Sequence, residues 1–260
     1  MDLQNIRLSL NTKWWGKELL FLPSTASTNI DATVLGYEGV PTGFTILADT
    51  QTAGRGRFGR SWFSPPGENL YFSTLLNATK KNFEISLVTL VAAVGVHDGL
   101  KKLFPSLKID IKWPNDLHVE RKKIAGILTE LHPLNPQQSF LVLGIGLNIN
   151  SHSFPKELTQ RASSLSLLND KRVLQREQIF VGLCQSLEEW YERWINEGFD
   201  SIQSYWATNS NMLGEQVRLL EPEPRLGAVR GLSNTGGLLV ELQNGSIEEI
   251  KSGEVQWASD

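Results

Sequence analysis

The sequence predicts an α+β fold in two domains, and three features of the chain lead to that prediction. Strand-like runs, many of them ending at glycine, proline or an Asn-Asp pair, recur between residues 43 and 150. Residues 84–104 are apolar nearly all round, as expected for a helix buried inside a domain. Beyond about Asn211, short β runs are separated by glycine and proline, which is typical of a small barrel. We therefore expect an α+β domain at residues 1–210 and a β-barrel module at 211–260.

Three helices are expected in the first domain. The first begins at about Ser27, because residues 27–29 are Ser-Thr-Asn and these residue types favour helix N-termini. The second is the apolar segment already described. The third spans residues 174–198, where apolar residues are spaced three and four apart, as in an amphipathic helix, and Gly198 is a suitable C-terminal cap.

Alternating apolar patterns and turn residues divide the rest of the chain into strands and tight turns. Pro114–Asp116 is predicted as a turn between two strands, and Arg121–Lys123 as a second turn. The expected strands of the first domain are 43–52, which runs into a polar loop, 69–77, 107–113, 117–120, 124–132 and 140–150, and those of the module lie within 215–222, 226–233, 236–242 and 246–257.

Composition and charge narrow the class of protein. Hydrophobic residues make up 40% and charged residues 20% of the 260 positions, which suits a globular protein with a sizeable core. The formal net charge is −3, so no overall field attracts nucleic acid or an anionic membrane, and any anion binding has to be local. No signal peptide or membrane-spanning stretch is apparent, so we expect no membrane partner.

Neither disulfide nor metal chemistry is indicated. Cys184 is the only cysteine, which excludes an internal disulfide and a cysteine-based zinc site and suits a reducing cytosol. It lies within the amphipathic helix, where we expect it to be a core residue. The histidines show no metal-ligand spacing and are given no role; they are His97, His118, His132 and His152.

The segment TAGRGRFGRSW, from Thr52 to Trp62, concentrates positive charge on a flexible backbone. It fits the pattern G-x-G-x-x-G, but polar residues precede it and Pro65 and Pro66 follow, so the strand and helix of a dinucleotide-binding turn are missing. Arginine presents a planar fork of donors that suits phosphate and carboxylate groups. We expect an anion-binding loop that is mobile when empty and becomes ordered when an anionic ligand binds.

The order of short motifs along the chain resembles that of the biotin protein ligases. GRGRFGR followed by W and SPPGENLYFS, then KWPND, RKKIAGILTEL and GIGLNIN, occur in this order between about Ser24 and Asn150. Any one of these motifs is weak, whereas five of them in order are very specific. The resemblance implies an α+β catalytic domain on a mixed sheet flanked by helices, similar to class II synthetases, and a C-terminal SH3-like barrel.

The resemblance also implies an activity in two steps. Biotin is activated with MgATP to biotinyl-5′-AMP and is then passed to a lysine of a biotin carboxyl carrier protein, such as that of acetyl-CoA carboxylase. Some members of the family carry an N-terminal DNA-binding domain. Because 26 residues precede Ser27, we expect a monofunctional cytoplasmic ligase that does not bind DNA. A homodimer is left open, as is the role of the barrel.

Site residues follow from matching each motif to the family pattern. Lys123 is the first candidate for catalysis, and Arg57 is the candidate for bridging the biotin carboxylate and the α-phosphate. Asp116 is expected to hold Mg²⁺ or to orient a substrate amine, and the sequence does not choose between these roles. The residues expected at biotin are Ser27, Thr28, Asn29, Gln51, Arg55, Gly56, Arg57 and Lys123. Those expected at ATP are Arg57, Arg60, Trp62, Lys112, Asn115, Asp116, Lys123 and Asn148.

Three glycines belong to the same motifs. Gly126 is expected to let the backbone approach the biotin ring closely, and Gly144 and Gly146 to leave room for that ring.

Other interpretations of these residues remain. A lipoate or octanoate ligase or transferase shares the fold, although the arginine loop and KWPND argue against it. A nucleic-acid-binding module would use the arginines with stacking tryptophans, and it would bind in a salt-sensitive manner without consuming ATP. A catalytically inactive biotin-binding regulator is a third alternative, against which the intact set of lysines and arginines argues.

Overall fold

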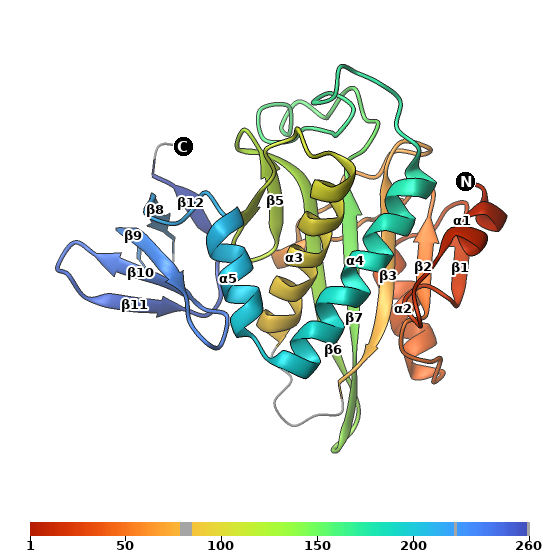
Figure 1. Ribbon diagram of the computed structural model, residues 1–260, viewed down its shortest axis with the longest axis horizontal. Coiled ribbons are helices and arrows are strands. Elements are labelled where there is room, and N and C mark those ends of the chain that lie inside the picture. Colours follow the sequence, from red (N-terminus) through yellow and green to blue (C-terminus); the bar gives the residue numbers. More distant parts are fainter. Residues whose placement is uncertain (79–84, 221–222, 259–260) are drawn as a thin grey trace.

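A computed structural model describes residues 1–78, 85–220 and 223–258 of the chain. A large mixed sheet with helices on both faces forms the main part, and a smaller sheet formed by the C-terminal residues lies beside it (Figure 1). Both parts confirm the predicted α+β class with a separate β module at the C-terminus. The predicted boundary between residues 210 and 211 falls in the connection between the last helix, which ends at Asn209, and the strand that begins at Gln216.

The main sheet has seven strands, in the order β1-β2-β3-β7-β6-β5-β4. β1 and β2 pair in parallel and the other neighbours are antiparallel, so the sheet is mixed. All the strands predicted in this domain are present with shifted ends, whereas β1 was not predicted. The bounds are β1 (Leu19–Leu22), β2 (Thr45–Ala48), β3 (Leu70–Asn77), β4 (Asp110–Lys112), β5 (Asp116–Val119), β6 (Lys122–Asn135) and β7 (Gln138–Leu147).

Both predicted turns are shorter than expected. Asp116, predicted in the turn Pro114–Asp116, is the first residue of β5 and pairs with Lys112, because antiparallel pairing with β4 extends the strand to that position.

Glu120 and Arg121 alone form the turn between β5 and β6, with φ values of 51° and 62°. Lys122 and Lys123 already belong to β6, where Lys123 pairs with His118. The prediction that Lys123 lies in the turn was therefore wrong. Because Lys123 pairs with His118 across the two strands, the two side chains lie on the same face of the sheet.

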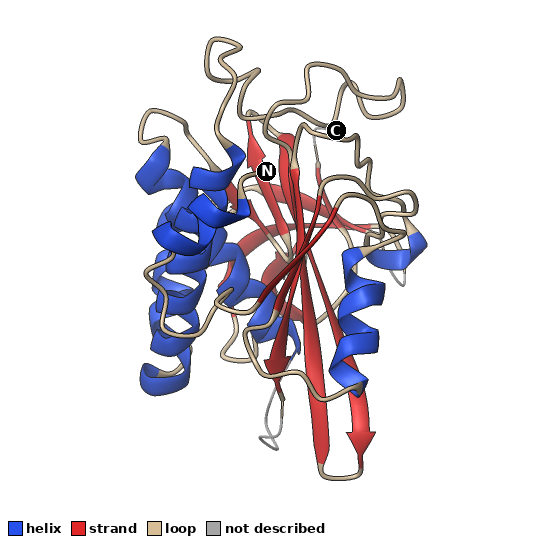
Figure 2. Cartoon of the chain, turned by 90° about the vertical axis from the view of Figure 1, so that its right-hand side faces the viewer, coloured by secondary structure: helices blue, strands red, loops and turns tan. Residues whose placement is uncertain are grey.

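Helices cover both faces of the main sheet. α2 (Thr28–Tyr37) lies behind the sheet in Figure 1, while α3 (Ile85–Leu103) and α4 (Arg176–Glu197) lie in front of it, and Figure 2 shows the same layers from the side. The three predicted helices are confirmed: α2 follows Ser27, α3 is buried along most of its length, and α4 ends at Glu197 with Gly198 as its C-terminal cap, whose φ is 85°. Glu84, predicted as the start of α3, lies outside the described residues. The helices α1 (Leu3–Ser9) and α5 (Asp200–Asn209) were not predicted.

The C-terminal module is an antiparallel sheet in the order β11-β10-β9-β8-β12. It packs on the main domain through Trp113, whose indole N–H donates to the carbonyl of Gly236 at 2.9 Å. The strand predicted within residues 215–222 is present and ends at Leu219, and residues 221–222 lie outside the described part of the chain. The strands are β8 (Gln216–Leu219), β9 (Arg225–Leu232), β10 (Leu238–Leu242), β11 (Ile247–Ile250) and β12 (Val255–Trp257).

Candidate active site

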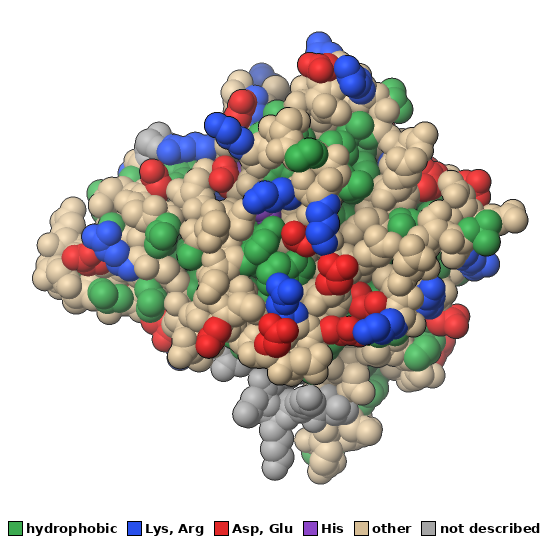
Figure 3. All heavy atoms as spheres, viewed as in Figure 1, with side chains coloured by type: hydrophobic (Ala, Val, Ile, Leu, Met, Phe, Trp, Pro, Cys, Tyr) green, Lys and Arg blue, Asp and Glu red, His purple; other side chains and the backbone are tan. Residues whose placement is uncertain are grey.

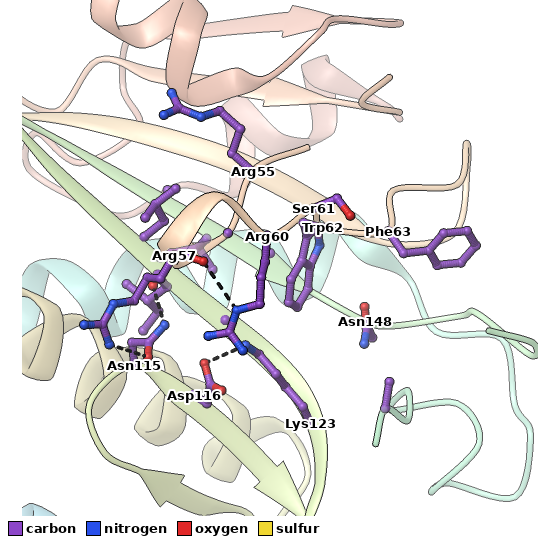
Figure 4. Close-up of a pocket in the computed structure, with 18 of the residues that line it drawn as sticks. Arg55, Arg57, Arg60, Ser61, Trp62, Phe63, Asn115, Asp116, Lys123 and Asn148 are labelled. Atoms are coloured by element: carbon purple, nitrogen blue, oxygen red, sulfur yellow. Dashed lines mark hydrogen bonds and ion pairs between the residues drawn. The ribbon is translucent and has the colours of Figure 1, made fainter. Parts of the chain in front are cut away.

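A pocket of about 300 Å³ opens where the arginine loop crosses strands β5, β6 and β7 (Figure 4). Every site residue predicted from the motifs lines it, although these residues come from five separate segments of the chain. They are Ser27, Thr28, Asn29, Gln51, Arg55, Gly56, Arg57, Arg60, Trp62, Lys112, Asn115, Asp116, Lys123 and Asn148.

The start of α2 forms a hydrogen-bonded polar corner of the pocket. Gln51 accepts a hydrogen bond from the backbone N–H of Thr28 at 2.9 Å, one of the amides that a helix N-terminus leaves without an internal partner. The hydroxyl of Ser73 lies 2.6 Å from Oδ1 of Asn29 and 2.7 Å from the hydroxyl of Thr28. These contacts fix the orientation of the Asn29 amide and leave a corner that suits a neutral, hydrogen-bonding ligand group.

Glycines on β6 and β7 make space for two of these side chains. A Cβ atom at Gly144 would lie 2.0 Å from Oδ1 of Asn29, and one at Gly146 would lie 2.4 Å from the indole of Trp62. The space expected above these glycines for a biotin ring is therefore occupied by Asn29 and Trp62. A Cβ atom at Gly126 would likewise lie 3.0 Å from the indole of Trp62.

The arginine loop folds into a short hairpin whose three guanidinium groups diverge (Figure 4). Arg55 pairs with Glu130 of β6 at 3.1 Å, and Arg60 pairs with Glu254 from the C-terminal module at 3.1 Å. Arg57 donates to Oδ1 of Asn115 at 3.2 Å. Burial lowers the pKa of Arg57, and the nearby Asp116 carboxylate opposes this effect.

The KWPND turn places Asn115 against its neighbour strand. Its backbone carbonyl accepts from the amide of Ile127, and its side-chain amide donates to the carbonyl of Ile127, both at 2.9 Å. The preceding peptide, Trp113–Pro114, is cis. The side chain of Asn115 is thereby fixed at the pocket wall, where it can accept from Arg57.

Lys123 and Asp116 form a close ion pair at the centre of the pocket. The distance from Nζ of Lys123 to Oδ1 of Asp116 is 2.6 Å, and Nζ also lies 5.3 Å from the centroid of the Trp62 ring. Burial raises the pKa of Asp116, but the charge of Lys123, together with His118, outweighs it and holds that pKa well below its usual value. The carboxylate is therefore ionised throughout the neutral range.

Two further predicted residues stand at the edges of the pocket. Asn148 donates to the carbonyl of Ser163 at 3.0 Å, and its own amide donates to the carbonyl of Ile124. Lys112 is directed toward Trp257 of the module, with Nζ 6.0 Å from the ring centroid. Hydrogen bonds to Ser163 and Ile124 thus fix the position of Asn148, while Lys112 lies at the boundary with the C-terminal sheet.

Several lining residues escaped the sequence analysis. Segment 151–175 crosses the pocket and pairs with β6 through a bridge between Lys123 and Ala162, and nothing in its sequence indicates this contact. His118 is two residues beyond Asp116 on β5, so the alternation of strand side chains is a signal that could have found it. The residues missed are Ser61, Phe63, His118, Ile127, Leu128, Ile145, Phe154, Leu158, Arg161, Ala162 and Glu254.

Comparison with known proteins identifies the family of this chain. A profile described as the Biotin/lipoate A/B protein ligase family matches residues 21–150, half of the chain, and one described as the biotin protein ligase C-terminal domain matches residues 212–257. The bifunctional ligase/repressor BirA of Bacillus subtilis is 32% identical over 96% of this chain and 77% of its own length. The chain belongs to the biotin protein ligase family. The C-terminal match discriminates here, because the first profile also covers lipoate ligases.

Other biotin protein ligases agree with this assignment. A biotin--[acetyl-CoA-carboxylase] ligase of Mycobacterium tuberculosis is 29% identical over 92% of this chain and 88% of its own length. The solved structure of the biotin protein ligase from Aquifex aeolicus in complex with biotin and ATP is 32% identical, with a TM-score of 0.80 over 92% of this chain and 98% of that one. No helix among residues 1–78, 85–220 and 223–258 combines the length and apolarity needed to cross a membrane.

Proposed function

We propose that this protein uses MgATP to convert biotin to biotinyl-5′-AMP and then transfers biotin to a lysine of a biotin carboxyl carrier protein. One observation carries the proposal: the pocket brings four arginines and two lysines next to the hydrogen-bonding corner at the start of α2. Membership of the biotin protein ligase family supports it, as does the similarity to a ligase whose structure contains biotin and ATP.

The first step joins two anions. A carboxylate oxygen of biotin attacks the α-phosphorus of ATP, the bond from that phosphorus to the bridging oxygen breaks, and pyrophosphate leaves. Cations aimed at the reacting oxygens lower the barrier because negative charge accumulates there in the transition state. Lys123 and Arg57 are proposed as the catalytic residues, since both line the pocket and contact adjacent residues of the KWPND motif, Lys123 at Asp116 and Arg57 at Asn115.

The second step needs no nucleophile from the enzyme. The amine of the carrier lysine attacks the acyl carbon of the mixed anhydride, the bond from carbon to the phosphate oxygen breaks, and AMP leaves. Cys184 fits this scheme because it is a buried, free thiol on α4 and does not line the pocket. Burial raises the pKa of the Cys184 thiol, which makes it a poor nucleophile.

Within the pocket, we assign biotin to the α2 side and the nucleotide to the KWPND side. Asp116 is assigned to holding Lys123 rather than Mg²⁺, because its two carboxylate oxygens face Lys123 and His118. Mg²⁺ then enters as part of the MgATP substrate. The proposed biotin contacts are Ser27, Thr28, Asn29, Gln51, Arg55, Gly56, Arg57 and Lys123, and the proposed nucleotide contacts are Arg57, Arg60, Trp62, Lys112, Asn115, Asp116, Lys123 and Asn148.

The remaining expectations are proposed on the same basis. Residues 1–210 are taken as the catalytic domain and 211–260 as the module, which supplies Glu254 to the pocket. We propose the cytoplasm as the location, in keeping with the reduced cysteine and the use of ATP.

A homodimer is also proposed, and light scattering tests it. Its candidate interface includes exposed apolar side chains such as Val34, Tyr37 and Leu134.

A nucleic-acid-binding module is not favoured. Basic and acidic side chains are interspersed on the face shown in Figure 3, rather than separated into a basic stripe. Each arginine of the loop also has an acceptor within the protein, namely Glu130, Asn115 and Glu254 in chain order.

The decisive experiment incubates the purified chain with biotin, MgATP and a biotin carrier domain and measures the mass of the carrier. We expect one biotinyl group on the carrier lysine and none when ATP is omitted or that lysine is replaced by arginine. Lipoate and octanoate in place of biotin serve as the comparison for the neighbouring activity. Modification of the carrier by lipoate but not by biotin would contradict the proposal.

A further inference from the structure

Residues 152–162 form a compact loop between two buried serines, Ser151 before it and Ser164 after it. The loop is folded on itself: the amide of Leu158 donates to the carbonyl of Pro155, and the amide of Ala162 donates to the carbonyl of Leu158, both at 2.8 Å. Its two ends therefore lie close together beneath a body on the protein surface, as in an Ω-loop.

Loop 152–162 forms one wall of the pocket. Its pocket-lining side chains are Phe154, Leu158, Arg161 and Ala162, whereas Lys156 is exposed. The ring of Phe154 also packs against that of Phe63, with the centroids 6.2 Å apart. The position of the loop thus sets the shape of the pocket on this side.

The wall lies on the nucleotide side of the pocket. The carbonyl of Arg161 accepts from the amide of Lys123 at 2.8 Å, and the carbonyl of Ser163 accepts from the side chain of Asn148 at 3.0 Å. Lys123 and Asn148 are both proposed nucleotide contacts. Among the described residues, no hydrogen bond joins the loop to the polar corner at the start of α2.

The hydroxyl of Ser164 closes the base of the loop. It donates to the carbonyl of Ser151 at 2.7 Å and accepts from the amide of Leu167 at 3.3 Å. Without this hydroxyl, the carbonyl of Ser151 would lack its hydrogen bond from Ser164 at a buried position, which is costly unless water reaches it. Because water reaches it only when the base opens, the hydroxyl favours the closed loop.

The other side of the base is fixed to the main sheet. The hydroxyl of Ser151 donates to Glu68 at 2.6 Å and accepts from the side chain of Asn69 at 2.8 Å. Asn69 directly precedes β3, and its Oδ1 accepts from the amide of Ile149 at 2.8 Å. Ser151 is thus a fixed point, and Ser164 connects the returning end of the loop to it.

We propose that Ser164 is a positioning residue that closes the base of loop 152–162 and so holds the nucleotide wall of the pocket in place. Ser164 does not itself line the pocket, so it acts through the loop. The inference rests on the proposed function, since it takes ATP as the ligand on this side. When the loop opens more often, the apparent affinity for ATP falls in proportion to the closed fraction.

The substitution Ser164→Ala tests the inference by steady-state pyrophosphate release. We expect the KM for ATP to rise about tenfold, as for a closed fraction of about one tenth, and kcat and the KM for biotin to change by less than about twofold. The matched control is Ser166→Ala, because Ser166 is equally buried and its hydroxyl has no partner among the described residues. All three constants should stay at their wild-type values in this control.

Trypsin provides a measurement of the loop that does not depend on activity. Lys156 and Arg161 are exposed cleavage sites within it, and mass spectrometry separates these cuts from those at other basic residues. Without ligands, Ser164→Ala should be cut in the loop faster than wild type and Ser166→Ala, and ATP should slow this cutting. Ser164→Cys, which keeps the shape but has only a weak donor, should fall between Ser164→Ala and wild type in both measurements.

Two results would overturn the inference. One is a KM for ATP, or a rate of cutting in the loop, that is the same in Ser164→Ala and Ser166→Ala. The other is an equal rise in the KM for ATP and for biotin, which would mean that the hydroxyl supports the pocket as a whole. Absence of biotinyl-adenylate formation by the wild-type protein would instead refute the proposed function, and the trypsin comparison would still decide whether Ser164 closes the loop.

Discussion

The carboxylate of Asp116 and the ammonium of Lys123 lie 2.6 Å apart, although the two residues stand on different strands and belong to different sequence motifs. The short turn at Glu120 and Arg121 brings β5 and β6 together, so that both side chains face the pocket. Asp116 thus holds the proposed catalytic lysine at the pocket centre before any substrate is present.

Replacing Lys123 by alanine is expected to reduce biotinyl-adenylate formation by about 100-fold to 1000-fold, the usual effect of removing a group that stabilises transition-state charge. Pyrophosphate release with biotin and MgATP measures it. Lys122→Ala, at the exposed neighbouring position on the same strand, is the control and should retain activity. Turnover of Lys123→Ala equal to wild type, in a protein with an unchanged melting temperature, would remove Lys123 from the mechanism.

The Asp116–Lys123 pair should also affect stability in a defined pH range. The pKa of Asp116 is depressed in the folded protein, so its contribution is fully present above the unfolded-state pKa of about 4 and is lost as the pH falls toward the folded-state pKa. We expect Asp116→Asn to lower the free energy of unfolding by ~1 to 3 kcal/mol at neutral pH.

Urea unfolding of wild type and Asp116→Asn from about pH 8 down to about pH 3 measures this difference. It should stay constant at neutral and mildly acidic pH and shrink below about pH 4. A difference that grows as the pH falls would mean that another group dominates.

Glu130 joins the arginine loop to the polar corner at the start of α2, the proposed biotin side of the pocket. One of its oxygens pairs with Arg55 at 3.1 Å, and the other accepts from Asn29 at 2.6 Å. Glu130→Gln removes the charge while keeping the shape, so we expect the KM for biotin to rise by about tenfold, equivalent to ~1.4 kcal/mol. Glu38→Gln, at the exposed end of α2, should leave the KM unchanged.

The same loop should respond to ligands. Limited proteolysis near Arg57 is expected to slow when biotin and ATP are added together, because the guanidinium groups gain anionic partners. Glu130→Gln should be cut faster than wild type without ligands. Equal rates of cutting with and without ligands would contradict closure of the loop.

Gly146 allows the indole of Trp62 to lie against β7. Because a Cβ atom there would stand 2.4 Å from the indole, Gly146→Ala should displace Trp62 and destabilise the protein by ~1 to 3 kcal/mol. The KM for ATP should rise more than the KM for biotin if Trp62 is a nucleotide contact. Steady-state kinetics with each substrate varied in turn makes the comparison, and Trp62→Phe is the matched variant.

Most of the fold follows from local patterns in the sequence. Periodicity located the strands β2 to β7 and the helices α2, α3 and α4, because each of them buries a face that repeats along the chain. α1, β1 and α5 escaped prediction although α5 is as long as α2 and β1 as long as β2. The start of α5 lacks the signal that identified α2, because its N-cap residue is Phe199 rather than a serine, threonine or asparagine. Lys123 was assigned to a turn because a run of three basic residues resembles a hairpin tip, whereas pairing with His118 extends the strand.

The chain by itself determined the chemical types of the site: its arginines, lysines and amides occur in motifs whose order identifies the family. Only the tertiary structure decided which of these groups touch. It pairs Asp116 with Lys123, ties the loop to Glu130 and Glu254, and turns the unassigned His118 toward the pocket. These contacts depend on strand register and on the docking of the C-terminal module, which are set by packing between segments far apart in the sequence.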